Sequence, residues 1–134
     1  MSQENVAVLR TAFDAYNRRD YDAALEPFHP EVEWHFPSTI GLDFEHLSGA
    51  DQIRDFWRSL DEVFEGFTLI LRELNAISEG VVLAHLRFEG RGRGSGAETE
   101  IEWHVVWRFR NGLVFRADHF LERPQALEAA GLSE

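Results

Sequence analysis

The sequence contains no cysteine, which excludes disulfide bonds and thiolate chemistry. Its 13 lysine and arginine residues face 24 aspartate and glutamate residues, for a formal net charge of -11 at pH 7. Nucleic acids and anionic membrane surfaces are bound through basic faces, so this balance argues against both as partners. No apolar run approaches membrane-spanning length, and the N-terminus lacks the basic and apolar regions of a signal peptide. We therefore expect a cytoplasmic protein.

Aromatic side chains, by contrast, are abundant. The chain carries 11 Phe, 4 Trp and 2 Tyr residues, and 44% of its residues are apolar. A length of 134 residues fits one domain, which we expect to extend over 1–134. Large rings leave irregular gaps when they pack, so this composition favours a core that encloses an apolar pocket.

Hydrophobic spacing divides the chain into a helical part and a sheet part. Helical spacing predicts a first helix capped by Ser2, a short second helix capped by Asp20, and a third closed by Gly66. Alternation of apolar and polar residues predicts strands, which are 32–36, 67–77, 81–89, 98–110 and 113–122. The remaining segments are a loop and a final helix, at 38–47 and 125–130. This order predicts an α+β fold with a curved, mostly antiparallel sheet wrapped around helices.

Four segments resemble, in the same order, those of SnoaL-like proteins, and these segments are 4–20, 29–35, 48–53 and 111–132. Such proteins belong to the nuclear transport factor 2-like superfamily, with the steroid isomerases, limonene epoxide hydrolase and polyketide cyclases. The resemblance implies a cone-shaped α+β barrel, usually dimeric, with a pocket between its helices and the concave face of its sheet. It does not select a reaction, because this fold hosts isomerases, cyclases, hydrolases and binding domains.

The dipeptide Asn111–Gly112 predicts a two-residue hairpin turn, which sets the register of the last two strands. Counting outward from the turn, alternation divides the side chains between two faces. The face expected to line the pocket carries Trp103, Val105, Trp107, Phe109, Val114, Arg116, Asp118 and Phe120. The face expected to be convex carries His104, Arg108, Phe115, Ala117 and His119. Three residues from other elements are expected to complete the ligand pocket, namely Tyr16, Trp34 and Trp57.

Asp118 is the first catalytic candidate, and it coincides with an aspartate of limonene epoxide hydrolase-like sequences. A carboxylate among tryptophan rings would lose its hydration, which raises its pKa and makes it suitable for proton transfer. The alternative is that Asp118 simply pairs with Arg116 and takes part in no chemistry.

His35 is the second catalytic candidate. Opposite Asp118, its ring would share a proton or bind a substrate oxygen. The alternative is an outward-facing ring on an edge strand, because Val32, Trp34 and Phe36 claim the inner face. His104 and His119 are expected to be neighbours on the convex face, but the sequence positions no third ligand there, so no metal site is predicted.

Two functions from different classes fit this pattern. The first is a cofactor-free enzyme that acts on a small hydrophobic molecule by acid–base chemistry, of isomerase, cyclase or hydrolase type. The steroid isomerase base is missing, because Phe36 occupies its position. The second is a non-catalytic domain that binds or senses a small hydrophobic ligand. A second polar group within reach of the base would favour the enzyme.

A homodimer is expected from the convex face. Val106, Leu113, Phe115 and Ala117 would form an apolar strip there, too apolar to remain exposed on a small domain.

Overall fold

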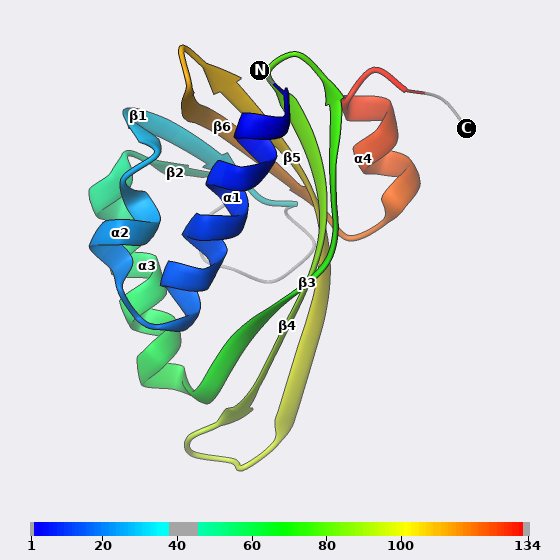
Figure 1. The fold of residues 1–134 in the computed structure, drawn as a ribbon. Coiled ribbons are helices and arrows are strands. Elements are labelled where there is room, and N and C mark those ends of the chain that lie inside the picture. The colour runs from blue at the N-terminus through cyan, green and yellow to red at the C-terminus, as the bar shows by residue number, and fades with distance from the viewer. Residues whose placement is uncertain (1, 38–45, 133–134) are drawn as a thin grey trace.

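The computed structural model describes residues 2–37 and 46–132, whose helices lie on the two faces of a curved sheet (Figure 1). Helices α1 (Ser2–Asn17), α2 (Tyr21–Leu25) and α3 (Ala50–Val63) lie together on one face. The short helix α4 (Arg123–Ala129) lies on the opposite face. None of the helices in the described part of the chain is long and apolar enough to cross a membrane.

The sheet has six strands in the order β2-β1-β6-β5-β4-β3. They are β1 (Phe28–His35), β2 (His46–Ser48), β3 (Phe64–Ser78), β4 (Val81–Gly92), β5 (Glu98–Arg110) and β6 (Leu113–Phe120). Neighbouring strands run antiparallel except β1 and β6, which are parallel. The sheet stays open, with β2 and β3 at its edges. The predicted α+β fold with a curved, mostly antiparallel sheet is confirmed.

The boundaries of the helices and strands differ from the predicted ones mainly where a short strand or a bend leaves no periodic pattern of hydrophobic residues in the sequence. Strand β1 starts at Phe28 instead of residue 32. Helix α3 passes directly into β3, and Gly66, with a φ of 66°, lies inside that strand instead of closing the helix. Strand β2 occupies the end of the predicted 38–47 loop, because it pairs with β1. The rest of that loop, 38–45, lies outside the described residues.

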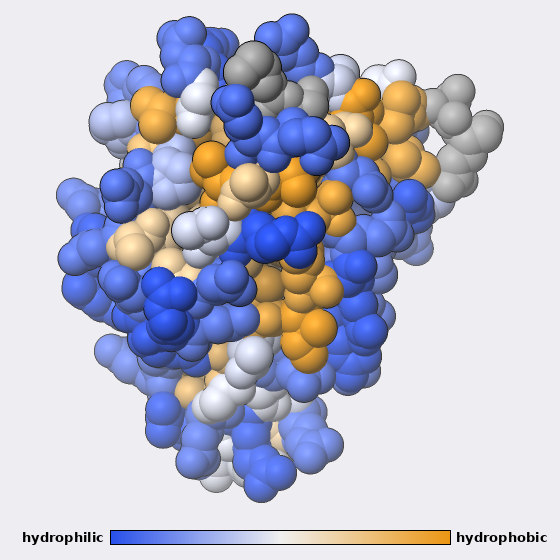
Figure 2. Space-filling view, viewed as in Figure 1, coloured by the Kyte–Doolittle hydropathy of each residue, from blue (hydrophilic) through white to orange (hydrophobic). Residues whose placement is uncertain are grey.

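The main core lies between helices α1 to α3 and the concave face of the sheet. Helix α1 contributes a stripe at helical spacing, of which Leu9 is fully buried and Tyr16 nearly so. Figure 2 shows hydrophobic side chains along the boundary between α1 and β3, where a groove is lined in part by Leu69, Leu71 and Leu74. A smaller cluster lies on the other face of the sheet, under α4.

That smaller cluster covers part of the strip expected to mediate dimerisation. Val106 is fully buried with Ala126 of α4, and Ala117 is fully buried on the concave face. The guanidinium of Arg110 lies 4.3 Å from the centre of the Phe115 ring. The predicted strip is therefore wrong for Val106 and Ala117, and the homodimer stays a prediction.

A β-bulge in β6 changes which residues face the core. Phe109 pairs with Val114, as a two-residue turn requires, but the next residue of β5, Arg108, pairs with Arg116. Phe115 is thus an extra residue in β6, and everything after it is displaced by one position. A displacement of one residue exchanges the two faces of a strand.

The predicted faces are accordingly correct for β5 and wrong for the second half of β6. His119 and Ala117 face the concave side, whereas Arg116, Asp118 and Phe120 face the convex side. The physical reason is the cost of burying charge. Without the bulge, the arginine and the aspartate would lie among tryptophan and valine side chains, where neither is hydrated.

The left-handed backbone conformation of the turn before this bulge can be tested by substitution. Asn111 has a φ of 54° and Gly112 a φ of 78°, and a Cβ at Gly112 would meet nothing within 4 Å. Backbone strain is then the main cost of Gly112→Ala, which should lower the free energy of unfolding by about 1 kcal/mol in urea titrations. Gly94→Ala is the control, because Gly94 is equally open but lacks a positive φ. Equal effects of the two substitutions would contradict this assignment.

Candidate functional site

A cavity of about 330 Å³ lies between the helices and the concave face of the sheet. Its wall is mostly aromatic, with rings from Phe13, Tyr16, Phe28, Trp34, Phe36, Phe56, Trp57, Phe64, Phe67, Phe88, Trp103 and Trp107. All four tryptophans of the chain are among them. The polar lining residues besides Tyr16 are Thr99, Glu100 and His119.

The residues predicted to form the ligand pocket divide between this cavity and the opposite face of the sheet. Those that line the cavity are Tyr16, Trp34, Trp57, Trp103 and Trp107. Arg116 and Phe120 do not line it, because the bulge turns both outward, and Phe120 packs beside α4 instead. Whether the cavity-lining residues contact a ligand stays a prediction.

Asp118 also lies outside the cavity, so its predicted position as a base in the pocket is wrong. Its carboxylate accepts three hydrogen bonds from Arg116, with Nε–Oδ2 at 2.9 Å, Nη2–Oδ1 at 3.0 Å and Nε–Oδ1 at 3.1 Å. Its side chain is 14% exposed on the convex face, and that of Arg116 is 42% exposed. The alternative prediction, an ion pair with Arg116, is confirmed.

The ring of His35 points away from the cavity as well. Its Nε2 lies 3.1 Å from Oε1 of Glu33, as expected for an outward-facing residue that alternates with Trp34. Its predicted position in the pocket is therefore wrong. His35 reaches the site through its backbone, because its carbonyl accepts a hydrogen bond from His119. The expected pairing of His104 with His119 is also wrong, since the two lie on opposite faces of the sheet.

His119 is the titratable side chain that the bulge turns into the cavity wall. Its Nδ1 lies 3.0 Å from the carbonyl oxygen of His35, the last residue of β1. A carbonyl only accepts, so Nδ1 carries the hydrogen and Nε2 is left as an acceptor. The ring stacks on Phe36 at 4.3 Å and meets Trp103 edge to face at 5.4 Å.

Burial sets the charge state of this histidine. Loss of hydration lowers the pKa of His119 to about 4, and this outweighs the opposing effects of the His35 carbonyl and of the Asp118 charge. At neutral pH the ring is uncharged.

Three of the residues that line the cavity carry a buried hydrogen-bond donor without a partner. The hydroxyl of Tyr16 and the indole nitrogens of Trp34 and Trp107 are buried, and none has a hydrogen-bond partner among the described residues. Buried polar groups are usually hydrogen-bonded, and leaving one unpaired costs free energy. Burial raises the pKa of Tyr16 above its ordinary value, so its hydroxyl keeps its proton. The residues that line the cavity thus carry three unpartnered donors, and Nε2 of His119 adds an acceptor.

His119 was missed by face counting because a bulge leaves no compositional mark of its own. The available signal was the pair of charges at 116 and 118. An unbulged register would bury both, and a shift of one residue removes this cost and turns His119 inward.

Comparisons with known proteins agree with the fold. A family profile described as a SnoaL-like domain matches residues 9–117. An NTF2-like protein from Burkholderia thailandensis is 25% identical, with 95% of each chain covered and a TM-score of 0.77. TerC, co-crystallised with polyporic acid, is 21% identical, with 96% of this chain and 97% of that chain covered and a TM-score of 0.76.

A third structure is similar as well. A hypothetical protein from Catenulispora acidiphila with a ketosteroid isomerase-like fold, in complex with trimethylamine, is 14% identical. The match covers 93% of this chain and 92% of the Catenulispora acidiphila chain, with a TM-score of 0.71. No curated protein matches the sequence.

The lowered pKa of His119 predicts how stability depends on pH. An unfolded chain protonates this histidine near pH 6.5, whereas the folded chain does so only near pH 4. Stability is therefore full above pH 6.5 and falls as the pH drops toward 4. Between pH 7 and pH 4.5, this one group should reduce the free energy of unfolding by about 2 kcal/mol.

Urea titrations of wild type and His119→Gln at both pH values measure this effect. The amide of glutamine does not titrate. On acidification, the free energy of unfolding of the variant should therefore fall by about 2 kcal/mol less than that of the wild type. Equal losses in the two proteins would mean that His119 is not buried as a neutral ring.

Proposed function

This chain belongs to the family of SnoaL-like domains, and we propose that its cavity binds a small, largely apolar molecule and acts on it by acid–base chemistry. The aromatic wall suits a hydrophobic ring, and its few polar groups would orient that ring. Two proteins of similar fold hold small molecules, polyporic acid in TerC and trimethylamine in the Catenulispora acidiphila protein. No cofactor is required by this chemistry.

The observation that carries the proposal is the position of the His119 ring beside two unpartnered indoles, with ring centres 5.2 Å from Trp34 and 6.4 Å from Trp107. In the proposed reaction, Nε2 of His119 accepts a proton from an acidic C–H or O–H group of the bound molecule. The bond to hydrogen breaks, and its electron pair stays on the molecule, as an enolate or alkoxide oxygen. The Tyr16 hydroxyl and an indole N–H donate hydrogen bonds to that oxygen. The protonated ring then returns the proton.

A non-catalytic binding domain is the second candidate, and the lowered pKa of His119 favours it. A general base works best when its pKa is near the working pH, and a ring with a pKa of about 4 holds a proton weakly at neutral pH. Such a ring remains a good hydrogen-bond acceptor. Catalysis therefore requires that the negative charge formed on the ligand raise the pKa of His119 during the reaction.

The remaining expectations from the sequence belong to this proposal too. They are one domain over 1–134, a homodimer and a cytoplasmic location. The homodimer is supported by Leu113 and Phe115, which are half-buried on β6, and sedimentation at micromolar concentration would test it. The location is supported by composition alone.

Deuterium exchange into 2-tetralone, an aromatic ketone with acidic α-hydrogens, tests the catalytic role. We expect the protein to accelerate exchange in D2O, followed by NMR, over buffer at the same pH. The acceleration should be about 100-fold, at the low end of what a positioned base supplies, because the pKa of His119 is low. His119→Phe keeps a ring in the wall but has no acceptor, and it should exchange 2-tetralone at the buffer rate.

Asp118→Asn is the matched control, because it changes the neighbouring residue on the opposite face of β6. This variant should retain most of the wild-type exchange rate, with a small loss because removing the Asp118 charge lowers the pKa of His119 further. Exchange lost equally in both variants would contradict the assignment of His119. Calorimetry on the wild type separates the two candidates, since 2-tetralone that binds without exchanging identifies a binding domain.

A further inference from the structure

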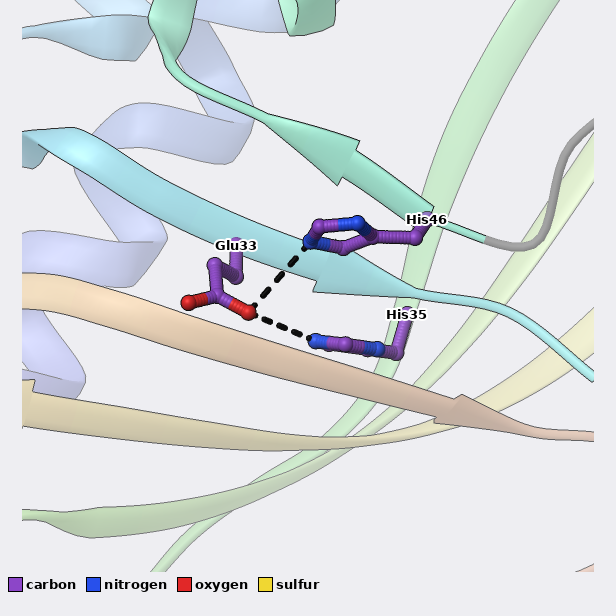
Figure 3. A group of neighbouring side chains, drawn as sticks. All are labelled: Glu33, His35 and His46. Carbon is purple, nitrogen blue, oxygen red and sulfur yellow. Dashed lines mark hydrogen bonds and ion pairs between the residues drawn. The ribbon is translucent and has the colours of Figure 1, made fainter.

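A second group of side chains lies on the outer side of the sheet edge formed by β1 and β2 (Figure 3). Glu33 and His35 are two residues apart on β1, so both point to the same face. His46, the first residue of β2, pairs directly with His35 across the two strands. The register of this short hairpin therefore brings one carboxylate and two imidazoles together.

The three groups converge on one carboxylate oxygen. Oε1 of Glu33 lies 3.1 Å from Nε2 of His35 and 3.3 Å from Nε2 of His46, as Figure 3 shows. All three atoms lie within 4.8 Å of one another. Ligand atoms around a tetrahedral zinc ion, bound at about 2.0–2.1 Å, are roughly 3.3 Å apart. The two separations between carboxylate and imidazole thus match a metal site, although the stacked rings, 4.5 Å apart, must tilt to aim their lone pairs at one ion.

The charges around the cluster also suit a cation. Arg116 of the neighbouring strand pairs with Glu33 in register, but Asp118 already binds its guanidinium through two oxygens. The hydrogen bond from His35 holds the pKa of Glu33 below its usual value, so the carboxylate is ionised. The side chains of His35, His46 and Glu33 are 32%, 46% and 47% exposed, which leaves an ion a direct path from solvent.

We propose that Glu33, His35 and His46 bind a divalent transition-metal ion of the zinc class. Such ions prefer ligand sets that include imidazole nitrogens, here two imidazoles and a carboxylate, over sets made only of oxygen ligands. Three protein ligands leave a fourth position for water or for a donor atom of another molecule. The site is on the opposite side of β1 from the cavity, so it stands independently of the chemistry of His119.

The chain carries a comparison group with the same residue types. His85 and His104 stack at 4.3 Å, and His85 lies 2.9 Å from Glu102. Among the described residues, however, these three do not converge on a common point as the edge cluster does. Substitution of His85 is therefore a matched control for non-specific binding to surface histidines.

Calorimetric titration of ZnCl2 into the tag-free, EDTA-treated chain tests the proposal. We expect one ion per chain, with Zn2+ affinity reduced at least about tenfold in His46→Gln and in Glu33→Gln. His85→Gln should bind as the wild type does. Co2+ bound at the same site should give the intense visible absorption of tetrahedral cobalt, and this absorption should be absent from His46→Gln.

Three results would overturn the proposal. They are wild-type binding no tighter than that of His46→Gln, equal weakening in His85→Gln, and Co2+ spectra that the substitutions at the edge cluster leave unchanged. Circular dichroism of each variant excludes unfolding as the cause, and His46 is exposed enough that its substitution should not disturb the core.

Discussion

The arrangement of this protein depends on keeping two charges out of an aromatic core. Arg116 and Asp118 lie on a strand whose inner face packs against tryptophan and valine side chains. An ion pair in that position would lose most of its hydration, and the attraction between its two charges often fails to offset that desolvation penalty. The bulge at Phe115 places the pair on the convex face, where it is partly exposed.

That one displaced residue also determines what faces the cavity. His119 follows Asp118 in sequence but lies on the other side of the sheet, anchored to the carbonyl of His35 and stacked on Phe36. His35 likewise contacts both sides of the sheet. Its carbonyl oxygen accepts the hydrogen bond from His119, and its ring belongs to the edge cluster with Glu33. Neighbouring residues of β1 and β6 thus serve two chemically different surfaces, one aromatic and enclosed, the other charged and open to solvent.

The segments with a clear hydrophobic period were sufficient to predict the fold. The features without a period, which are the bulge in β6 and the short strand β2, could not be predicted. Val32 and Trp34 alternate with outward residues as expected, and the turn at 111–112 joins β5 and β6 where predicted. The faces of β5 were correct because its register follows from that turn up to Phe109 and its side chains alternate without interruption. The faces of β6 after Phe115 were wrong because alternation cannot detect an inserted residue. Strand β2 is three residues long, too short for any period, so the convergence of His46 on Glu33 could be seen only in the structure.

The chemistry of the cavity depends on His119 being a buried, neutral imidazole with its hydrogen on Nδ1. NMR of the 15N-labelled histidine rings across a pH series tests it most directly, with the His119 signals assigned by their loss in His119→Gln. We expect an Nδ1–H tautomer that stays uncharged until the pH approaches about 4. A His119 ring that titrates near pH 6.5, as an exposed histidine does, or that carries its hydrogen on Nε2, would contradict it.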